Sequence, residues 1–260
     1  MHKKKSLEQH FLRSRSYLNA IPDAAEIKTG DTVLEIGPGE GTLTEVLLER
    51  GARVVAIEKD SRLISFLKEK FAGKNFELTE GDALDFDISN QLKKKEFKVV
   101  GNIPYYITGA LLKKFLSGDV QPSTLVFLLQ KEVAERITRS KKESILSLSV
   151  KAYGDPTYIK TVPCGAFAPS PKADSAILRV AHPSRTYFTR STSPSANSQC
   201  EKRFFELVKK GFSSKRKILK SNLKPLLGEK AETLGIVRAE DVPLKRWLAL
   251  SKVEGLELGA

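Results

Sequence analysis

The chain has 260 residues, of which 40% are hydrophobic and 29% charged, so it is long enough to bury a full core and carry a small second domain. Its formal net charge of +13 predicts a polyanionic partner, most simply a nucleic acid. No run of about 18 apolar residues is present, which excludes a transmembrane helix, and no Cys-x-x-Cys pair or Cys/His cluster suggests a zinc site.

The cysteines and the N-terminal residues indicate the cellular compartment of the protein. Cys164 and Cys200 are isolated from each other, as is usual in a reducing cytosol. Residues 1–6 are basic but lead into no apolar stretch, so they do not resemble a secretory signal. We therefore expect a cytoplasmic protein that binds no metal and no membrane.

Short apolar runs alternate with helical patterns through the first two thirds of the chain. The helical spacing is clearest at Leu63, Phe66, Leu67 and Phe71. The predicted strands are 32–36, 53–58, 76–80, 98–102 and 124–129, and the predicted helices are 43–50, 61–71 and 108–116. This alternation predicts an α/β fold in which a parallel sheet carries helices on both faces.

The last third of the chain changes character. Two further strands are predicted at 158–162 and 176–180, and because no helix separates them they suit an antiparallel hairpin at one edge of the sheet. Serine, threonine and proline then dominate to residue 199, after which an apolar helical pattern resumes. We predict one domain at 1–183, a linker at 184–199 and a small helical domain at 200–260.

The segment 35–41 follows the first strand and opens a helix. Its glycines, Gly37, Gly39 and Gly41, allow a sharp turn and a close approach of the backbone to a ligand. Glu58 ends the second strand about 20 residues further on, where an acidic side chain can bind both ribose hydroxyls. Asp82, after the third strand, can reach an adenine amine. These features together predict a nucleoside-containing cofactor.

A nicotinamide dinucleotide is the alternative ligand for this loop. Such a site usually has a further glycine at the start of the helix, where this chain has Thr44. In addition, the acids Glu35, Glu58 and Asp82 suit a cation better than a pyrophosphate. We therefore favour the sulfonium cofactor S-adenosylmethionine.

Four residues at the end of the fourth predicted strand, Asn102-Ile103-Pro104-Tyr105, suit a planar base that carries an exocyclic amine. The side-chain oxygen of Asn102 and the carbonyl of Pro104, which cannot be tied into a regular helix, can each accept a hydrogen bond from the amine. Tyr105 can stack on the ring, which contributes roughly 1–3 kcal/mol per base.

Taken together, these segments resemble the small-subunit ribosomal RNA adenine N6,N6-dimethyltransferases of bacterial type, which modify two adjacent adenosines in a loop near the 3′ end of the RNA. The matching segments are 4–12, 35–44, 57–60, 81–84, 102–105, 167–176 and 205–224. The most family-specific of them is 167–176. The resemblance implies a Rossmann-like class I methyltransferase domain with a mostly parallel seven-stranded sheet, a C-terminal helical RNA-binding domain, and a role in small-subunit biogenesis.

The resemblance also assigns residues. It implies that the cofactor is lined by His10, Leu12, Gly37, Glu58, Asp82 and Asn102, to which the glycine loop adds Gly39. Phe167 is expected to close the face of the target base opposite Tyr105, with core packing as the alternative. Two departures from the family are Glu8, where glycine is common, and His10, where some members have asparagine.

The implied reaction is an in-line displacement at the sulfonium methyl by the adenine N6. Hydrogen bonds to Asn102 and Pro104 would aim the nitrogen lone pair, and no general base is required because the product nitrogen loses its proton to water. The target adenosine must leave its stack to reach such a pocket, which costs least in a loop or at an end.

The start of the C-terminal domain is strongly basic. Between Lys202 and Lys224 there are nine lysines and arginines and one acid, Glu206. We expect Lys215, Arg216 and Lys217 to contact phosphates, which position an RNA without reading its sequence. Residues 3–5, Arg13 and Arg15 are the alternative footprint. The expected partner is small-subunit ribosomal RNA or an immature small subunit, bound by a monomer.

Three other functions fit part of the pattern. A ribosome-assembly or organellar transcription factor with secondary catalysis is one, but the intact glycine loop and the turn at 102–105 argue against it. A large-subunit ribosomal RNA adenine methyltransferase shares that turn, and a DNA adenine methyltransferase has compatible chemistry. The string 167–176 favours the small-subunit family over both.

Overall fold

The computed structural model describes residues 10–92, 96–189 and 194–252. The chain divides into two compact units: Met1–Ala134 with Asp155–Pro183, and Glu135–Gly154 with Ser184–Ala260. Within the described ranges, no helix has the length and apolar character needed to cross a membrane.

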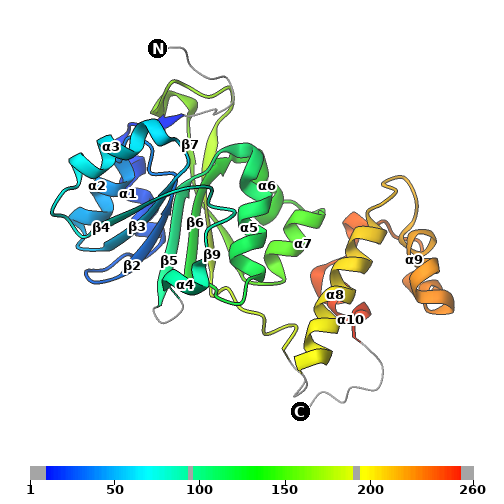
Figure 1. Ribbon diagram of the computed structural model, residues 1–260. Helices are drawn as coiled ribbons and strands as arrows, with labels where there is room; N and C mark the ends of the chain where they lie inside the picture. The colour runs from blue at the N-terminus through cyan, green and yellow to red at the C-terminus, as the bar shows by residue number, and fades with distance from the viewer. Residues whose placement is uncertain (1–9, 93–95, 190–193, 253–260) are drawn as a thin grey trace. The chain divides into compact units, whose positions relative to one another are not determined.

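The first unit is built on a seven-stranded sheet (Figure 1). Its strand order is β4-β3-β2-β5-β6-β9-β7, and β4 to β6 in that order are parallel, whereas β9 runs antiparallel to both of its neighbours. The strands are β2 (Thr32–Ile36), β3 (Arg53–Glu58), β4 (Phe76–Glu80), β5 (Phe97–Asn102), β6 (Thr124–Gln130), β7 (Asp155–Val162) and β9 (Ser175–Ala181). The predicted mostly parallel sheet with an antiparallel hairpin at one edge is thus confirmed.

Helices cover both faces of the sheet. Figure 1 shows α1, α2 and α3 on one side and α5 on the other. On the first side, Ile21 of α1 and Leu47 of α2 share one buried cluster with Val126 of β6; on the second, Phe115 of α5 meets Phe127 with ring centroids 6.3 Å apart. The helices of this unit are α1 (Arg15–Ala24), α2 (Thr42–Glu49), α3 (Ser61–Lys70), α4 (Ile88–Leu92), η1 (Tyr105–Ile107), α5 (Thr108–Ser117) and η2 (Cys164–Ala166), and α6 (Lys131–Thr138) follows β6 across the unit boundary.

A second, two-stranded sheet lies outside this framework. β1 (Phe11–Leu12) pairs antiparallel with β8 (Phe167–Ala168), so that Phe11 faces Ala168 and Leu12 faces Phe167 in register. The sequence pattern did not predict this pairing. It brings the start of the described chain alongside the segment between β7 and β9.

The second unit is helical in its described part, as predicted for the C-terminal region. It contains α7 (Ile145–Lys151), α8 (Pro194–Gly211), α9 (Leu219–Leu227), η3 (Gly228–Leu234), η4 (Ala239–Asp241) and α10 (Leu244–Leu250). Its core includes Phe204, Leu223 and Trp247, and the indole nitrogen of Trp247 donates to the carbonyl of Val242 at 3.1 Å.

The predicted linker at 184–199 has more structure than its composition indicated. Phe188 is 1% exposed, and its ring lies 5.4 Å from those of Tyr153 and Phe204. Helix α8 begins at Pro194, also inside this range. The serine- and proline-rich segment therefore contributes one aromatic side chain to the helical core, and burial of this side chain holds the segment against that core.

Candidate functional site

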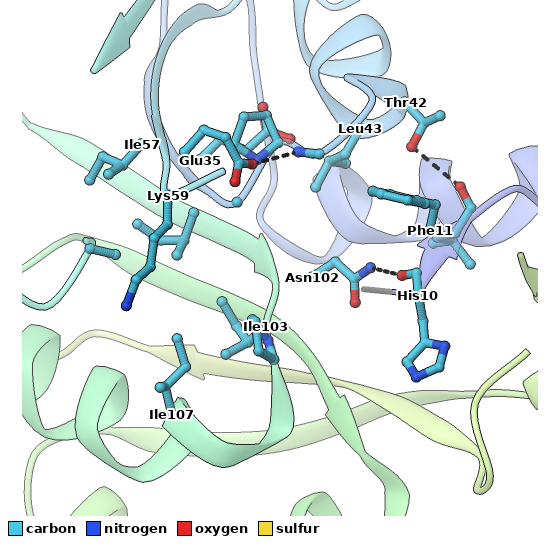
Figure 2. Close-up of a pocket in the computed structure, with 18 of the residues that line it drawn as sticks. His10, Phe11, Glu35, Thr42, Leu43, Ile57, Lys59, Asn102, Ile103 and Ile107 are labelled. Atoms are coloured by element: carbon cyan, nitrogen blue, oxygen red, sulfur yellow. Dashed lines mark hydrogen bonds between the residues drawn. The ribbon is translucent and has the colours of Figure 1, made fainter. Parts of the chain in front are cut away.

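A pocket lies at the carboxyl edge of the parallel strands, where β2, β3, β4 and β5 end (Figure 2). The structure brings to it every residue that the sequence assigned to the cofactor: His10, Leu12, Gly37, Gly39, Glu58, Asp82 and Asn102. Pro104 and Tyr105 also line it. Lys59, Phe11 and Tyr106 are lining residues that the sequence analysis did not predict.

The glycine loop approaches the pocket without side chains. Gly39 has a φ of +60°, and a Cβ atom at this position would lie 2.7 Å from the ring of Phe11. Any side chain here would therefore be both strained and in collision with Phe11. Gly37, which also lines the pocket, has a φ of +66°, and no atom lies within 4 Å of the position that its Cβ would take.

Glu58 ties the end of β3 to this loop. Its side chain accepts one hydrogen bond from the Gly39 N–H at 3.0 Å and another from the Asp60 N–H at 2.8 Å. Burial, which leaves Glu58 only 4% exposed, raises the pKa of its carboxyl group. Since each carboxylate oxygen has two lone pairs, both can still accept a hydroxyl proton from a ligand.

Glu35 lies deeper, at 1% exposed, and accepts a hydrogen bond from the Thr44 hydroxyl at 2.7 Å. Burial is the main cause that raises its pKa to about 8, and the nearby charge of Glu58 adds to the effect. Glu35 therefore holds its proton at neutral pH. Thr44, which occupies the position of a dinucleotide-type glycine, is the partner of this acid.

Replacing Glu35 by glutamine is expected to change how stability depends on pH. The folded protein keeps the Glu35 proton up to about pH 8, whereas the unfolded chain loses it near the ordinary value of 4.5. The stabilising contribution of this group is thus complete below 4.5 and is lost as the pH rises through 8. Relative to wild type, the free energy of unfolding of Glu35→Gln should rise from about pH 5.5 to about pH 8, as measured by urea titration. If the free energy of unfolding had the same pH dependence in the two proteins, the raised pKa of Glu35 would be disproved. The control is Glu80→Gln, the same substitution at an exposed position.

Asp82 is already engaged by protein groups. Its Oδ1 accepts a hydrogen bond from the Leu84 N–H at 2.9 Å, and its Oδ2 accepts one from Lys59 Nζ at 2.7 Å. The hydrogen bond from Lys59 lowers the pKa of the Asp82 carboxyl group, which is therefore ionised at neutral pH. The amine of an adenine would meet this carboxylate in the pocket.

The amide of Asn102 has a fixed orientation. Its Nδ2 donates to the main-chain oxygen of His10 at 2.7 Å, and since a carbonyl oxygen can only accept, the nitrogen must be the atom on that side. Figure 2 shows this bond, with the amide oxygen directed away from it. That oxygen is left as an acceptor that lines the pocket.

Pro104 and Tyr105 are held more firmly than expected. The Pro104 carbonyl accepts the Ile107 N–H at 3.2 Å in the 3₁₀ turn η1, so the expectation that it would stay outside helical bonding was wrong. A turn can begin directly after a proline because proline lacks only the N–H and keeps its carbonyl acceptor. The carbonyl oxygen of Pro104 still has a second lone pair. The Tyr105 hydroxyl shares a hydrogen bond of 2.9 Å with Ser175 at the start of β9, which fixes the ring.

Phe167 is not among the lining residues of the pocket. It is 6% exposed and belongs to the buried cluster that also contains Leu12 and Ala166. In this conformation it packs as a core residue, and its role opposite Tyr105 stays a prediction.

The N-terminal segment runs along the pocket and is held on both sides. The Thr42 hydroxyl donates to the Leu12 carbonyl at 3.3 Å, and His10 Nδ1, which must carry a proton, donates to the Pro169 carbonyl at 2.8 Å. The rest of the predicted capping segment, residues 4–9 with Glu8, lies outside the described residues.

The predicted RNA-contacting residues do not belong to the pocket. Lys215, Arg216 and Lys217 are exposed and lie between α8 and α9, rather than on a helix face. In contrast, Arg13 and Arg15 of the alternative footprint form ion pairs with Glu40 and Glu49, and residues 3–5 lie outside the described range.

Comparison with known proteins places these features in context. A family model described as ribosomal RNA adenine dimethylase matches residues 1–250. Ribosomal RNA small subunit methyltransferase A of Dehalococcoides mccartyi is 39% identical over 260 residues, which cover 95% of this chain and 87% of the relative. The protein of the same name from Deinococcus radiodurans is 38% identical, and the match covers 97% of this chain and 86% of the relative.

Two solved structures are similar over most of the chain. A dimethyladenosine transferase from Plasmodium falciparum has a TM-score of 0.76 and 28% identity, with 93% of this chain and 96% of the other covered. The 23S rRNA methyltransferase ErmE has a TM-score of 0.72 and 29% identity, with 93% and 98% covered.

Proposed function

Because the chain belongs to the ribosomal RNA adenine dimethylase family, we propose that its pocket holds S-adenosylmethionine next to the N6 amine of an adenosine in small-subunit ribosomal RNA. The chain is an S-adenosylmethionine-dependent rRNA adenine dimethyltransferase with a Rossmann-like class I fold. The curated relatives that are 38–39% identical are named as small-subunit enzymes, which favours small-subunit over large-subunit RNA.

The residues present fit the cofactor. The backbone at Gly37, where no atom lies within 4 Å of the position of a Cβ, leaves room for a nucleoside, and the free lone pairs of Glu58 suit two ribose hydroxyls. Asp82 provides a carboxylate for the adenine amine. The ionised Asp82 and the nearby Glu58 suit the positive sulfonium better than a pyrophosphate, whereas Glu35 holds its proton and adds no charge.

The observation that carries the proposal is the fixed amide of Asn102. When bound, the cofactor supplies an electrophilic methyl group. The Asn102 oxygen and the remaining lone pair of the Pro104 carbonyl accept hydrogen bonds from the two N6 hydrogens, which pulls the amine toward tetrahedral geometry. Tyr105 stacks on the base. After transfer the surplus proton on N6 goes to water. Phe167 would complete the clamp if it turned out of the core on substrate binding.

A direct experiment tests this function. The protein and labelled S-adenosylmethionine are incubated in parallel with undermethylated small ribosomal subunits and with large subunits, and the label is mapped on each RNA. We expect it on the N6 atoms of two adjacent adenosines in a loop near the 3′ end. Label on large-subunit RNA, or none on either, would refute the proposed substrate. We further propose that the enzyme acts in the cytoplasm as a monomer on immature small subunits.

Neutralising Lys215, Arg216 and Lys217 together is expected to weaken RNA binding and flatten its salt dependence. Each phosphate contact contributes about −0.7 to −0.9 to the log–log slope, and all three side chains are exposed. Cofactor affinity should stay constant because the cofactor residues belong to the other unit. RNA affinity measured over a range of salt concentrations gives the slope.

The matched control for this triple variant removes Lys68, Lys74 and Lys113, three exposed lysines of the first unit, with the same change in net charge. Its salt slope should stay close to that of wild type. An unchanged slope in the Lys215, Arg216 and Lys217 variant would mean that these charges are only solvated and that the RNA footprint lies elsewhere.

A further inference from the structure

Lys59 occupies a position in the pocket that neither the family assignment nor the reaction requires. It follows Glu58 at the end of β3, and its Nζ lies 2.7 Å from Asp82 Oδ2. The side chain of Lys59 is 58% exposed, whereas that of Asp82 is 24% exposed. Both residues line the same cavity, in which Figure 2 labels Lys59.

The contact competes with the proposed adenine site. Asp82 Oδ1 accepts the Leu84 N–H and Oδ2 accepts a hydrogen bond from Lys59, so an incoming amine must share an oxygen with one of these donors or displace it. The Leu84 N–H is part of the backbone, whereas the ion pair with so exposed a lysine is weak and can be exchanged for another partner. Adenine binding can therefore displace Lys59 at little cost.

The released ammonium would remain in the same pocket as the residues proposed to hold the target base. Tyr106, which is 60% exposed, also lines the cavity and follows Tyr105 in η1. The hydrogen bond with Asp82, followed by the charge of Asp82 and more weakly that of Tyr106, raises the pKa of Lys59, so Lys59 keeps its proton. In the proposed function, the RNA strand that delivers the target base to Tyr105 would pass this part of the pocket.

We propose that Lys59 couples cofactor binding to RNA binding by exchanging the Asp82 carboxylate for an RNA phosphate when the adenine of the cofactor occupies Oδ2. This inference rests on the proposed function, in which Asp82 binds the adenine. In the cofactor-free enzyme Lys59 neutralises Asp82 and contributes little to RNA affinity. In the cofactor-bound enzyme it is a phosphate ligand. Each ligand then raises the affinity for the other by the same factor.

The test measures this factor with sinefungin, a non-reactive analogue of the cofactor, and unmethylated small ribosomal subunits. We expect sinefungin to tighten RNA binding by about three- to fivefold in wild type, because the coupling cannot exceed the strength of the Lys59–Asp82 pair that is exchanged. In Lys59→Met the factor should fall below about twofold, and sinefungin should bind more tightly without RNA because its competitor is gone. Lys59→Arg retains the charge and should retain the coupling.

Lys68→Met is the matched control, since it removes the same charge from an exposed position of α3 that does not line the pocket. It should couple like wild type. Full coupling in Lys59→Met, or no coupling in a wild-type protein that binds both ligands, would overturn the proposed role of Lys59 but leave the proposed function intact. A wild-type protein that binds no sinefungin would overturn the proposed function as well. Melting curves of each variant exclude misfolding as the cause of a difference.

Discussion

Replacing Asn102 by alanine is expected to lower kcat for methyl transfer by about 100-fold, which corresponds to about 2.7 kcal/mol of transition-state stabilisation. The amide oxygen is the acceptor that aims the amine, and its direction is set by the bond from Nδ2 to the His10 carbonyl at 2.7 Å. Cofactor affinity should change far less than kcat, because the ribose and adenine contacts come from Glu58 and Asp82. Single-turnover methyl transfer, combined with calorimetric titration of the cofactor, separates the two quantities.

The control for this prediction is Asn90→Ala, the same substitution at an exposed position of α4. It should leave both quantities unchanged. Tyr105→Ala should likewise lower methyl transfer sharply with an intact fold, since the ring that stacks on the base is lost. If the folded Asn102→Ala enzyme turns over near the wild-type rate, the amine is held by other groups.

Replacing Glu58 is expected to weaken cofactor binding by at least tenfold, or about 1.4 kcal/mol. Alanine removes the acceptor of the ribose hydroxyls, but it also leaves the buried N–H groups of Gly39 and Asp60 without a partner, at roughly 1–3 kcal/mol each. Glutamine keeps the volume and one acceptor, so Glu58→Gln should lose affinity with less loss of stability. Calorimetry and thermal unfolding of both variants measure the two effects.

Glu80→Gln is the matched control for Glu58. Glu80 lies opposite Glu58 in the register of β3 and β4, but it is exposed and does not line the pocket. The control should bind the cofactor like wild type. Unchanged cofactor affinity in a folded Glu58→Gln protein would remove Glu58 from the ribose site.

The sheet could be predicted closely from the sequence. Strands β2, β3 and β4 have the bounds that their sequence patterns predict. β2 and β3 are mostly apolar because they are buried parallel strands, whereas β4, at the edge of the sheet, alternates apolar and polar residues. Helix α1 was missed since only Leu18, Ile21, Pro22 and Ala24 are buried in ten residues, and proline in the last turn argues against a helix. The two-residue strands β1 and β8 are too short to show any periodicity.

The site was predictable at the level of residues but not of contacts. The carboxyl ends of parallel strands meet at one edge, so Glu58, Asp82 and Asn102 could be expected together. Which side chain pairs with which depends on tertiary packing: the bond between Asn102 and His10 joins residues 92 positions apart, and that between Lys59 and Asp82 joins residues 23 apart. No local pattern contains this information.

The two-stranded sheet of β1 and β8 has a consequence for the order in which this protein matures. His10 bonds to Pro169 across 159 positions, and Tyr105 bonds to Ser175 across 70. Contacts over such distances form late, because the chain must close a long loop before they repay its entropy. A nascent chain that has not yet exposed residue 175 therefore lacks both the inner wall of the pocket and the anchor of its tyrosine. The cofactor can act as a folding ligand only once the whole first unit has left the ribosome.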